Sequence, residues 1–209
     1  MRIIVFGATG GTGREIVTQA LERAHEVTVF VRNPDKLAIN HASLRVLRGS
    51  ITDDALALAA AVRGQDAAIS ALGLGGGLKS GGLIERSTQS IVPAMESQRV
   101  RRLIVVSAFG VGETRRDVPL APRLLQCLLL RDIFADKLAG EAILRASRLD
   151  WTLVYPSILT NGPRTGSYRA GERLELHGLP SISRADVADF LLRQLEDITY
   201  VKKGALLSY

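Results

Sequence analysis

Short apolar runs alternate with amphipathic stretches along this chain of 209 residues. The apolar runs are rich in Val, Ile and Leu and contain few polar breaks, which is typical of strands covered on both faces of a sheet. They predict strands at Arg2–Phe6, Glu26–Val31, Leu44–Leu47, Ala67–Ala71, Leu103–Ser107 and Thr152–Tyr155, with a further candidate at Ala205–Ser208. Helices are predicted at Gly11–Arg23, Asp53–Val62, Leu83–Gln98, Pro122–Ser147 and Arg184–Leu195.

The alternation of strands and helices predicts an α/β fold, with a doubly wound parallel sheet in a three-layer α/β/α arrangement of the Rossmann type. Right-handed crossovers place the loop after each strand at one edge of such a sheet, where ligands bind. The candidate site therefore consists of Gly7–Gly13, Arg32–Pro34, Ser50–Asp54, Gly73–Gly82, Ser107–Gly112 and Pro156–Thr160. A chain of this length has room for one sizeable core and shows no linker, so we expect a single domain over residues 1–209.

The composition of the chain argues against nucleic-acid, membrane and metal partners. The net charge of +6 comes from scattered arginines and only 5% of residues are aromatic, so we expect a solvated basic surface and no nucleic-acid partner. The single cysteine, Cys127, excludes an internal disulfide framework. No apolar run approaches the roughly 20 residues that span a bilayer, and the chain opens on a core strand, so we expect a cytoplasmic protein without a membrane partner. The three histidines (His25, His41 and His177) show no ligand spacing, and we expect no metal site.

Glycines gather directly after the first predicted strand, where residues 1–13 read MRIIVFGATGGTG. A strand that turns on glycine into a helix aims free backbone N–H groups and the positive end of the helix dipole at one spot, which suits a pyrophosphate. In this G-x-x-G-x-x-G pattern, Gly7 makes the tight turn, Gly10 lets phosphates approach the backbone, and Gly13 lets the helix pack close to the strand. The alternative is a glycine-rich turn that binds nothing, at an entropy cost that a mere turn does not require.

Two other loops bear on the identity of the ligand. Arg32 follows the second strand, where NAD-binding versions of this unit place an acidic residue on the ribose 2′-hydroxyl. A guanidinium binds a 2′-phosphate that a carboxylate would repel, so the sequence favours NADP(H) over NAD(H); the alternative is a solvated loop arginine. The glycine-rich loop Gly73–Gly82 suits either a lid over the nicotinamide or a plain surface loop.

Taken with the glycine loop and Arg32, four further segments carry a resemblance to a known family: Ser107–Phe109, Asp150–Pro156, Thr165–Tyr168 and Ser181–Val187. The chain resembles an atypical short-chain dehydrogenase/reductase of the NAD(P)H-binding, NmrA-like group, and within it the flavin reductase/biliverdin-IXβ reductase branch. The resemblance covers nearly the whole chain and implies a single Rossmann domain whose small C-terminal portion, residues 156–183, lies on the substrate side. It implies cofactor contacts at Gly7, Thr9, Gly10, Gly11, Thr12, Gly13, Arg32, Ser50, Ile51, Ala71, Leu72, Gly73, Ser107, Lys137, Tyr155, Pro156, Ser157 and Ile158.

Some positions depart from the family pattern. Conventional members use Tyr-x-x-x-Lys, in which the tyrosine donates a proton and the lysine holds the ribose. Here Lys137 matches the lysine, but Ile133 stands at the position of the tyrosine and cannot exchange a proton. Gly49–Ser50 replaces the usual Gly-Asp, which leaves the adenine end to be held mainly by backbone. Ser157 stands where the biliverdin-reducing branch has a histidine, which weakens the expectation of that substrate.

The catalytic candidates are Ser107 and Lys137. The hydroxyl of Ser107 lies at the carboxyl end of a strand, where it would hydrogen-bond the acceptor or the nicotinamide carboxamide; the alternative is a bond to nearby backbone. Reducing a flavin or quinone requires chiefly hydride positioning over a flat ring, so the missing tyrosine is no bar. We therefore expect an NADPH-dependent reductase of a small planar acceptor, monomeric or homodimeric. A non-catalytic redox sensor that reads NADP(H) is the alternative favoured by Ile133, and a nucleotide-sugar epimerase or dehydratase is the third.

Overall fold

The computed structural model describes residues 1–73, 80–117 and 130–209. Its main sheet consists of β1 (Arg2–Phe6), β2 (Glu26–Val31), β3 (Leu44–Arg48), β4 (Ala67–Ser70), β5 (Arg102–Val106), β6 (Asp150–Pro156), β8 (Arg169–Gly171) and β10 (Lys203–Ser208). The strands lie in the order β3-β2-β1-β4-β5-β6-β10-β8, and every neighbouring pair is parallel except β10 and β8. Strand order reverses at β1 and β4, so the loops that follow these two strands flank the position where such sheets bind ligands.

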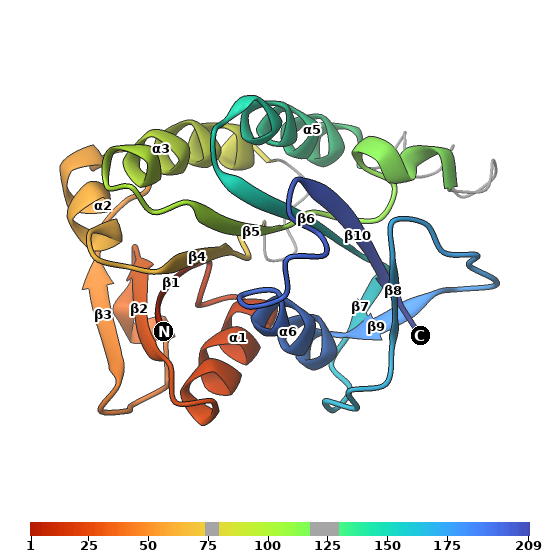
Figure 1. Cartoon of the computed structure of the whole chain (residues 1–209), viewed down its shortest axis with the longest axis horizontal. Coiled ribbons are helices and arrows are strands. Elements are labelled where there is room, and N and C mark those ends of the chain that lie inside the picture. The colour runs from red at the N-terminus through yellow and green to blue at the C-terminus, as the bar shows by residue number, and fades with distance from the viewer. Residues whose placement is uncertain (74–79, 118–129) are drawn as a thin grey trace.

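Helices cover both faces of this sheet (Figure 1). They are α1 (Gly11–Glu22), α2 (Ala55–Val62), α3 (Leu83–Ser97), α5 (Arg131–Ala146) and α6 (Arg184–Arg193), with short 3₁₀ turns η1 (Pro34–Lys36) and η2 (Gly112–Asp117). On one face α1 and α6 bury an apolar cluster that includes Ile16 and Leu191. On the other face α2, α3 and α5 bury a second cluster around Met95 and Leu144. The expected doubly wound, three-layer α/β/α fold is confirmed.

The predicted elements correspond closely to the observed ones where an apolar run ends sharply. The bounds of β1 and β2 are those predicted, whereas β7 (Ile158–Thr160), β8 and β9 (Ser181–Ser183) were not predicted because three residues are too few to show a period. One of these unpredicted strands, β8, runs antiparallel to β10 at the edge of the otherwise parallel sheet. The helix predicted from Pro122 is described from Arg131 onward. Its earlier part, including Cys127, lies outside the described residues, as do residues 74–79 of the Gly73–Gly82 loop.

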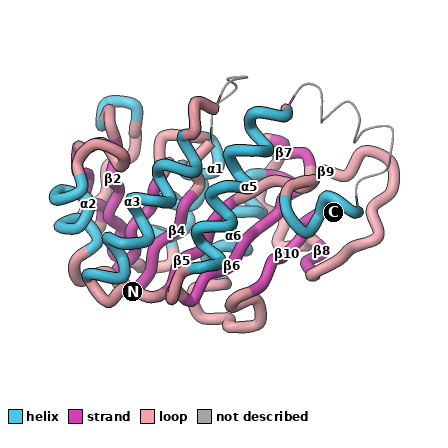
Figure 2. Tube along the Cα trace, turned by 90° about the horizontal axis from the view of Figure 1, so that it is seen from above, coloured by secondary structure: helices cyan, strands magenta, loops and turns pink. Residues whose placement is uncertain are grey.

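A buried carboxylate anchors the C-terminal portion, residues 156–183, which lies beyond β6 and β10 (Figure 2). In this portion β7 and β9 pair as a small parallel sheet. Asp186, near the start of α6, accepts hydrogen bonds from the backbone N–H groups of Thr165 and Gly166 at 2.8 Å each and from the Tyr209 hydroxyl at 2.7 Å. Burial raises the pKa of Asp186, but these hydrogen bonds outweigh it and leave the pKa below its ordinary value.

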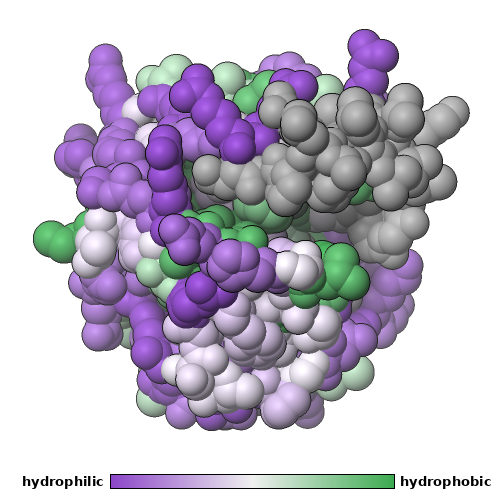
Figure 3. Space-filling model, turned by 90° about the vertical axis from the view of Figure 1, so that its right-hand side faces the viewer, coloured by the Kyte–Doolittle hydropathy of each residue, from purple (hydrophilic) through white to green (hydrophobic). Residues whose placement is uncertain are grey.

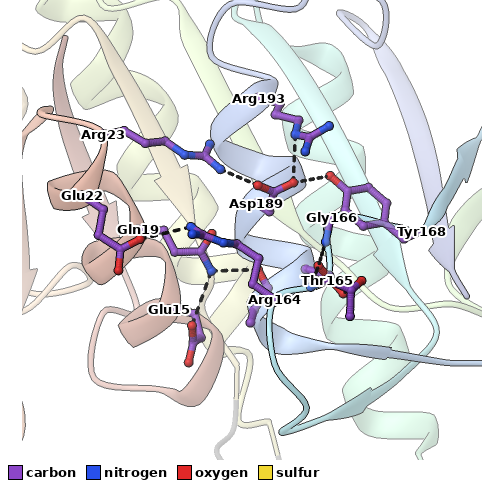
Figure 4. Close-up of polar contacts among 12 residues, drawn as sticks. Glu15, Gln19, Glu22, Arg23, Arg164, Thr165, Gly166, Tyr168, Asp189 and Arg193 are labelled. Atoms are coloured by element: carbon purple, nitrogen blue, oxygen red, sulfur yellow. Dashed lines mark hydrogen bonds and ion pairs between the residues drawn. The ribbon is translucent and has the colours of Figure 1, made fainter.

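A second carboxylate on α6 joins three segments (Figure 4). Asp189 accepts from Arg23, at the end of α1, at 2.5 Å, from the Tyr168 hydroxyl at 2.8 Å and from Arg193 at 2.8 Å. Gln19 of α1 also donates to the Ala185 carbonyl at 2.8 Å. These bonds hold α6 against the later part of α1, the helix that follows the glycine loop.

Candidate functional site

The glycine loop needs glycine at two positions for steric reasons. Gly7 has a φ of +79°, and a Cβ there would lie 2.6 Å from the Ala71 carbonyl oxygen. At Gly13 a Cβ would lie 2.1 Å from the carbonyl oxygen of Gly7, so only glycine lets α1 start this close to β1. A Cβ on Gly10 would meet nothing nearer than 3.4 Å, so the protein by itself leaves room there. Gly10 caps α1 without a side-chain hydrogen bond, which leaves the first N–H groups of the helix free for an anion.

A guanidinium from the C-terminal end of the chain lies over this loop. A Cβ on Gly11 would lie 2.8 Å from Cδ and 2.9 Å from Nε of Arg184, the first residue of α6. Arg184 donates to the amide oxygen of Asn161 at 2.7 Å, and it forms no ion pair with a carboxylate of the described residues. Its charge therefore adds to the positive end of α1. Arg184 was not predicted, because no local pattern in the sequence shows that α6 packs against α1.

Charged groups come together in the loops after β2 and β3, at the same edge of the sheet as the glycine loop. Ser50 donates its hydroxyl to Asp53 at 2.5 Å. The pKa of Asp53 is lowered, first by the hydrogen bonds from Ser50 and Thr52 and then by the positive charges of Arg86 and Arg32. Arg32 is exposed, as predicted for a loop residue after β2. Arg86, on α3, was not predicted; it donates to the carbonyl oxygens of Gly81 and Gly82.

The remaining predicted contacts on this side follow β3 and β4. Ala71 continues β4, with its N–H donating to the Phe6 carbonyl at 2.9 Å, and lies against Gly7. Leu72 and Ile51 are half-buried and pack on the core, and Gly73 is exposed. Thr9 is half-buried and Thr12 is buried at the start of α1. These positions follow β1, β3 and β4, and their contact with a cofactor stays a prediction.

Both predicted catalytic residues reach one small cavity at the carboxyl end of β5. Ser107 and Lys137 line it together with Glu141, and its volume of about 10 Å³ is room for a single water molecule. The hydroxyl of Ser107 donates to Oε1 of Glu141 at 2.5 Å, and Nζ of Lys137 donates to the Val106 carbonyl at 3.4 Å. Burial lowers the pKa of Lys137 to about 8, against the opposing effect of the nearby carboxylates of Glu141 and Asp136. Ile133, one turn earlier on α5, supplies no proton-exchanging group.

The four residues Tyr155–Ile158, all predicted as cofactor contacts, differ in how far their side chains are exposed. The Tyr155 side chain is buried, and its hydroxyl donates to Oε2 of Glu141 at 2.9 Å, so only its backbone can meet a ligand. Burial raises the pKa of Tyr155 above its ordinary value. Ser157 is buried with its hydroxyl 3.2 Å from that of Ser208, Pro156 is buried in β6, and Ile158 is 56% exposed.

Glu141 is the central residue that the sequence analysis missed. It is 4% exposed and lies one helical turn after Lys137 on α5, so the i to i+4 spacing was the available signal. Burial raises its pKa, against hydrogen bonds from Ser107 and Tyr155 that lower it. In the part of the chain that the structure describes, no group of three His, Cys, Asp or Glu side chains is placed to hold a metal ion. None of the helices described is long and apolar enough to cross a membrane.

Comparisons with known proteins identify the family and the fold. The pattern of a family described as NAD(P)H-binding matches residues 7–198. An uncharacterized chloroplastic protein of Arabidopsis thaliana is 30% identical over 174 residues, which cover 79% of this chain but only 62% of that relative. The structure of ChuY, an anaerobillin reductase from Escherichia coli O157:H7, superposes with a TM-score of 0.81 at 24% identity, covering 99% of this chain and 96% of ChuY. The structure of a short-chain dehydrogenase/reductase from Veillonella parvula in complex with NADP superposes with a TM-score of 0.80 at 21% identity, covering 100% of this chain and 94% of that one. Likeness at these identities shows the fold.

Proposed function

Because the chain belongs to the NAD(P)H-binding family, we propose that it is an NADPH-dependent reductase that transfers hydride to a small planar acceptor such as a flavin or a quinone. The observation that carries the proposal is the shared cavity of Ser107 and Lys137 beside Ile133. A hydroxyl and an amine that would orient a bound cofactor lie there, whereas Ile133 stands in place of the proton-exchanging tyrosine of alcohol-oxidising relatives. This combination supports hydride positioning as the main task of the site.

The residues at the switch point fit a dinucleotide. The diphosphate would lie on the free N–H groups of Gly11 and Thr12, where Gly10 leaves room that a Cβ would fill. Arg184 would contact the same phosphates from above, and Lys137 would hold the nicotinamide ribose. When bound, the nicotinamide supplies the hydride; the chain orients it and excludes water around the reacting ring.

The charges near Asp53 support NADP(H) over NAD(H). Arg32 and Arg86 both lower the pKa of Asp53, so two guanidinium groups lie in this region that could bind a 2′-phosphate. We expect Arg32→Ala to raise the Kd of NADPH much more than that of NADH, as measured by titration of each cofactor. Equal losses for both cofactors would remove Arg32 from this role.

The C-terminal portion supplies a surface for the acceptor. The face of the molecule that carries it shows hydrophobic residues gathered near its middle (Figure 3). Ile158 and Leu179 of this portion are 56% and 87% exposed. Exposed apolar side chains in the portion expected on the substrate side would suit a flat, largely apolar ring, which supports a flavin or quinone as the acceptor.

The test follows NADPH absorbance with the purified protein and a panel of flavins and quinones. Saturable oxidation that falls sharply in Ser107→Ala, with NADPH binding retained, would support the reductase. Tight binding of NADPH without turnover of any acceptor would instead support the second candidate, a redox sensor that reads NADP(H). That candidate is favoured by Ile133, since a protein that only reads the cofactor has no need of a proton donor. An epimerase or dehydratase of nucleotide sugars is the least favoured, because such chemistry moves a proton at the position that Ile133 occupies.

A further inference from the structure

We infer that Glu141 holds the proton that Ser107 passes to the acceptor, which makes Glu141 the positioning residue that replaces the missing tyrosine. The inference rests on the proposed reductase function. It starts from a continuous chain of hydrogen bonds that runs from Ser107 through Glu141 and Tyr155 to Arg145.

Arg145, at the outer end of this chain of hydrogen bonds, determines the direction of the bonds that follow. Arg145 is a donor only, so its contact of 3.2 Å with the Tyr155 hydroxyl uses a lone pair of that oxygen. The proton of Tyr155 must then point to Oε2 of Glu141, 2.9 Å away. Oε2 already accepts from Tyr155, so a proton added to Glu141 is placed on Oε1, 2.5 Å from Ser107 Oγ. The bond that Ser107 donates to the ionised carboxylate then reverses its direction.

The protonation state of Glu141 therefore decides what Ser107 offers to a ligand. When Glu141 is neutral, it donates to Ser107, and the hydroxyl proton of Ser107 is free to point toward the acceptor. When Glu141 is ionised, Ser107 must donate to the carboxylate and presents only lone pairs to the acceptor. The site reduces its acceptor in the first state and is idle in the second.

The surroundings of Glu141 favour its protonated form more than water does. Burial raises its pKa, which outweighs the hydrogen bonds from Ser107 and Tyr155 and the charges of Arg145 and Lys137. Within the described residues these are the titratable and charged groups that face it, together with Glu113, which acts through a 2.6 Å ion pair with Arg145. A Cβ on Gly112 would lie only 2.4 Å from Oε2 of Glu141, so the backbone of η2 closes the cluster on that side.

The transfer is balanced as a two-electron reduction. The acceptor receives hydride from the cofactor at one atom, and at another atom it gains the proton of the Ser107 hydroxyl. As that O–H bond breaks, the Oε1–H bond of Glu141 breaks and its proton moves to Ser107 Oγ. The Glu141 carboxylate then takes a proton from water, which restores the starting state. No further reductant is required.

Two variants and one control test this role by a pH profile and by spectroscopy. In the wild type, turnover should fall as the pH rises through the pKa of Glu141, and the infrared carbonyl band of a protonated carboxyl should vanish over the same range. Glu141→Gln should remove both the carbonyl band and this fall of turnover with rising pH (the pH limb). It should slow turnover about 100-fold and leave the Kd of NADPH unchanged. Tyr155→Phe removes a hydrogen bond that favours the ionised form, so it should move the limb and the band to higher pH. Glu96→Gln, the same type of change on the surface of α3, should behave like the wild type in both measurements.

The outcomes separate the inference from the function on which it rests. If Glu141→Gln or Tyr155→Phe turns over acceptors with the wild-type rate and pH limb, the inference is overturned and the reductase stands. A carbonyl band that persists in Glu141→Gln overturns it as well, whatever the turnover. If the wild type binds NADPH and reduces no acceptor, both the proposed function and the inference fail.

Discussion

The Arg184 side chain allows a sharp test of the cofactor site, because it comes from the opposite end of the sequence to the glycine loop that it covers. Arg184→Ala should weaken NADPH binding about 10-fold. A hydrogen bond to a charged group contributes about 1.5–3 kcal/mol. Arg184 is half-buried, so solvent screening favours the lower end of that range, and about 1.4 kcal/mol corresponds to a factor of ten in Kd.

A second substitution reaches the same guanidinium from the other side. A Cβ on Gly11 would meet only the flexible end of Arg184, at 2.8 Å from Cδ, so Gly11→Ala should displace that side chain without unfolding the loop. We expect its effect on Kd to resemble that of Arg184→Ala. The double variant should bind no more weakly than either single variant, since the two changes remove the same contact.

The assay is calorimetric titration of each variant with NADPH at two salt concentrations. The dependence of binding on salt should be weaker without Arg184, because one charge contact with the phosphates is lost. Arg164→Ala is the matched control, since Arg164 is an exposed arginine of the C-terminal portion that pairs with Glu22 at 3.1 Å. Wild-type affinity in Arg184→Ala, or effects of the two single changes that simply add, would refute the contact.

Two further predictions concern stability. Gly13→Ala should lower the free energy of unfolding by about 3 kcal/mol and Tm by about 9 °C, because the new Cβ would lie 2.1 Å from the backbone oxygen of Gly7. Gly10→Ala is the control, since its Cβ would meet nothing nearer than 3.4 Å. It should keep the wild-type Tm in differential scanning calorimetry and lose only NADPH binding. Asp186→Asn should cost about 2 kcal/mol at neutral pH in urea denaturation. Since the folded pKa of Asp186 lies below its ordinary value of 3.8, its stabilisation is present above that pH and is lost as the pH falls through the folded pKa, so the difference from the wild type should shrink in acid. A difference that grows in acid would contradict this assignment.

Local sequence patterns determined the strands, the helices and the glycine loop. The bounds of β1 and β2 followed from their apolar runs, and the roles of Gly7 and Gly13 followed from a strand that turns at once into a helix. These features depend on residues a few positions apart, so their spacing is visible along the chain. The positions of Ser107 and Lys137 were also predictable, from the ends of parallel strands and from the family resemblance.

Tertiary structure alone decided which distant side chains meet. Arg184 reaches Gly11 with its side chain because Gln19, in the later part of α1, binds the start of α6 at the Ala185 carbonyl. Glu141 became the partner of Ser107 and Tyr155 because α5 packs over the carboxyl ends of β5 and β6. The same packing buries the Tyr155 side chain, which leaves only its backbone for the predicted cofactor contact. Such contacts join segments far apart in the chain, and no periodicity or spacing encodes them, because they depend on how whole elements pack against one another.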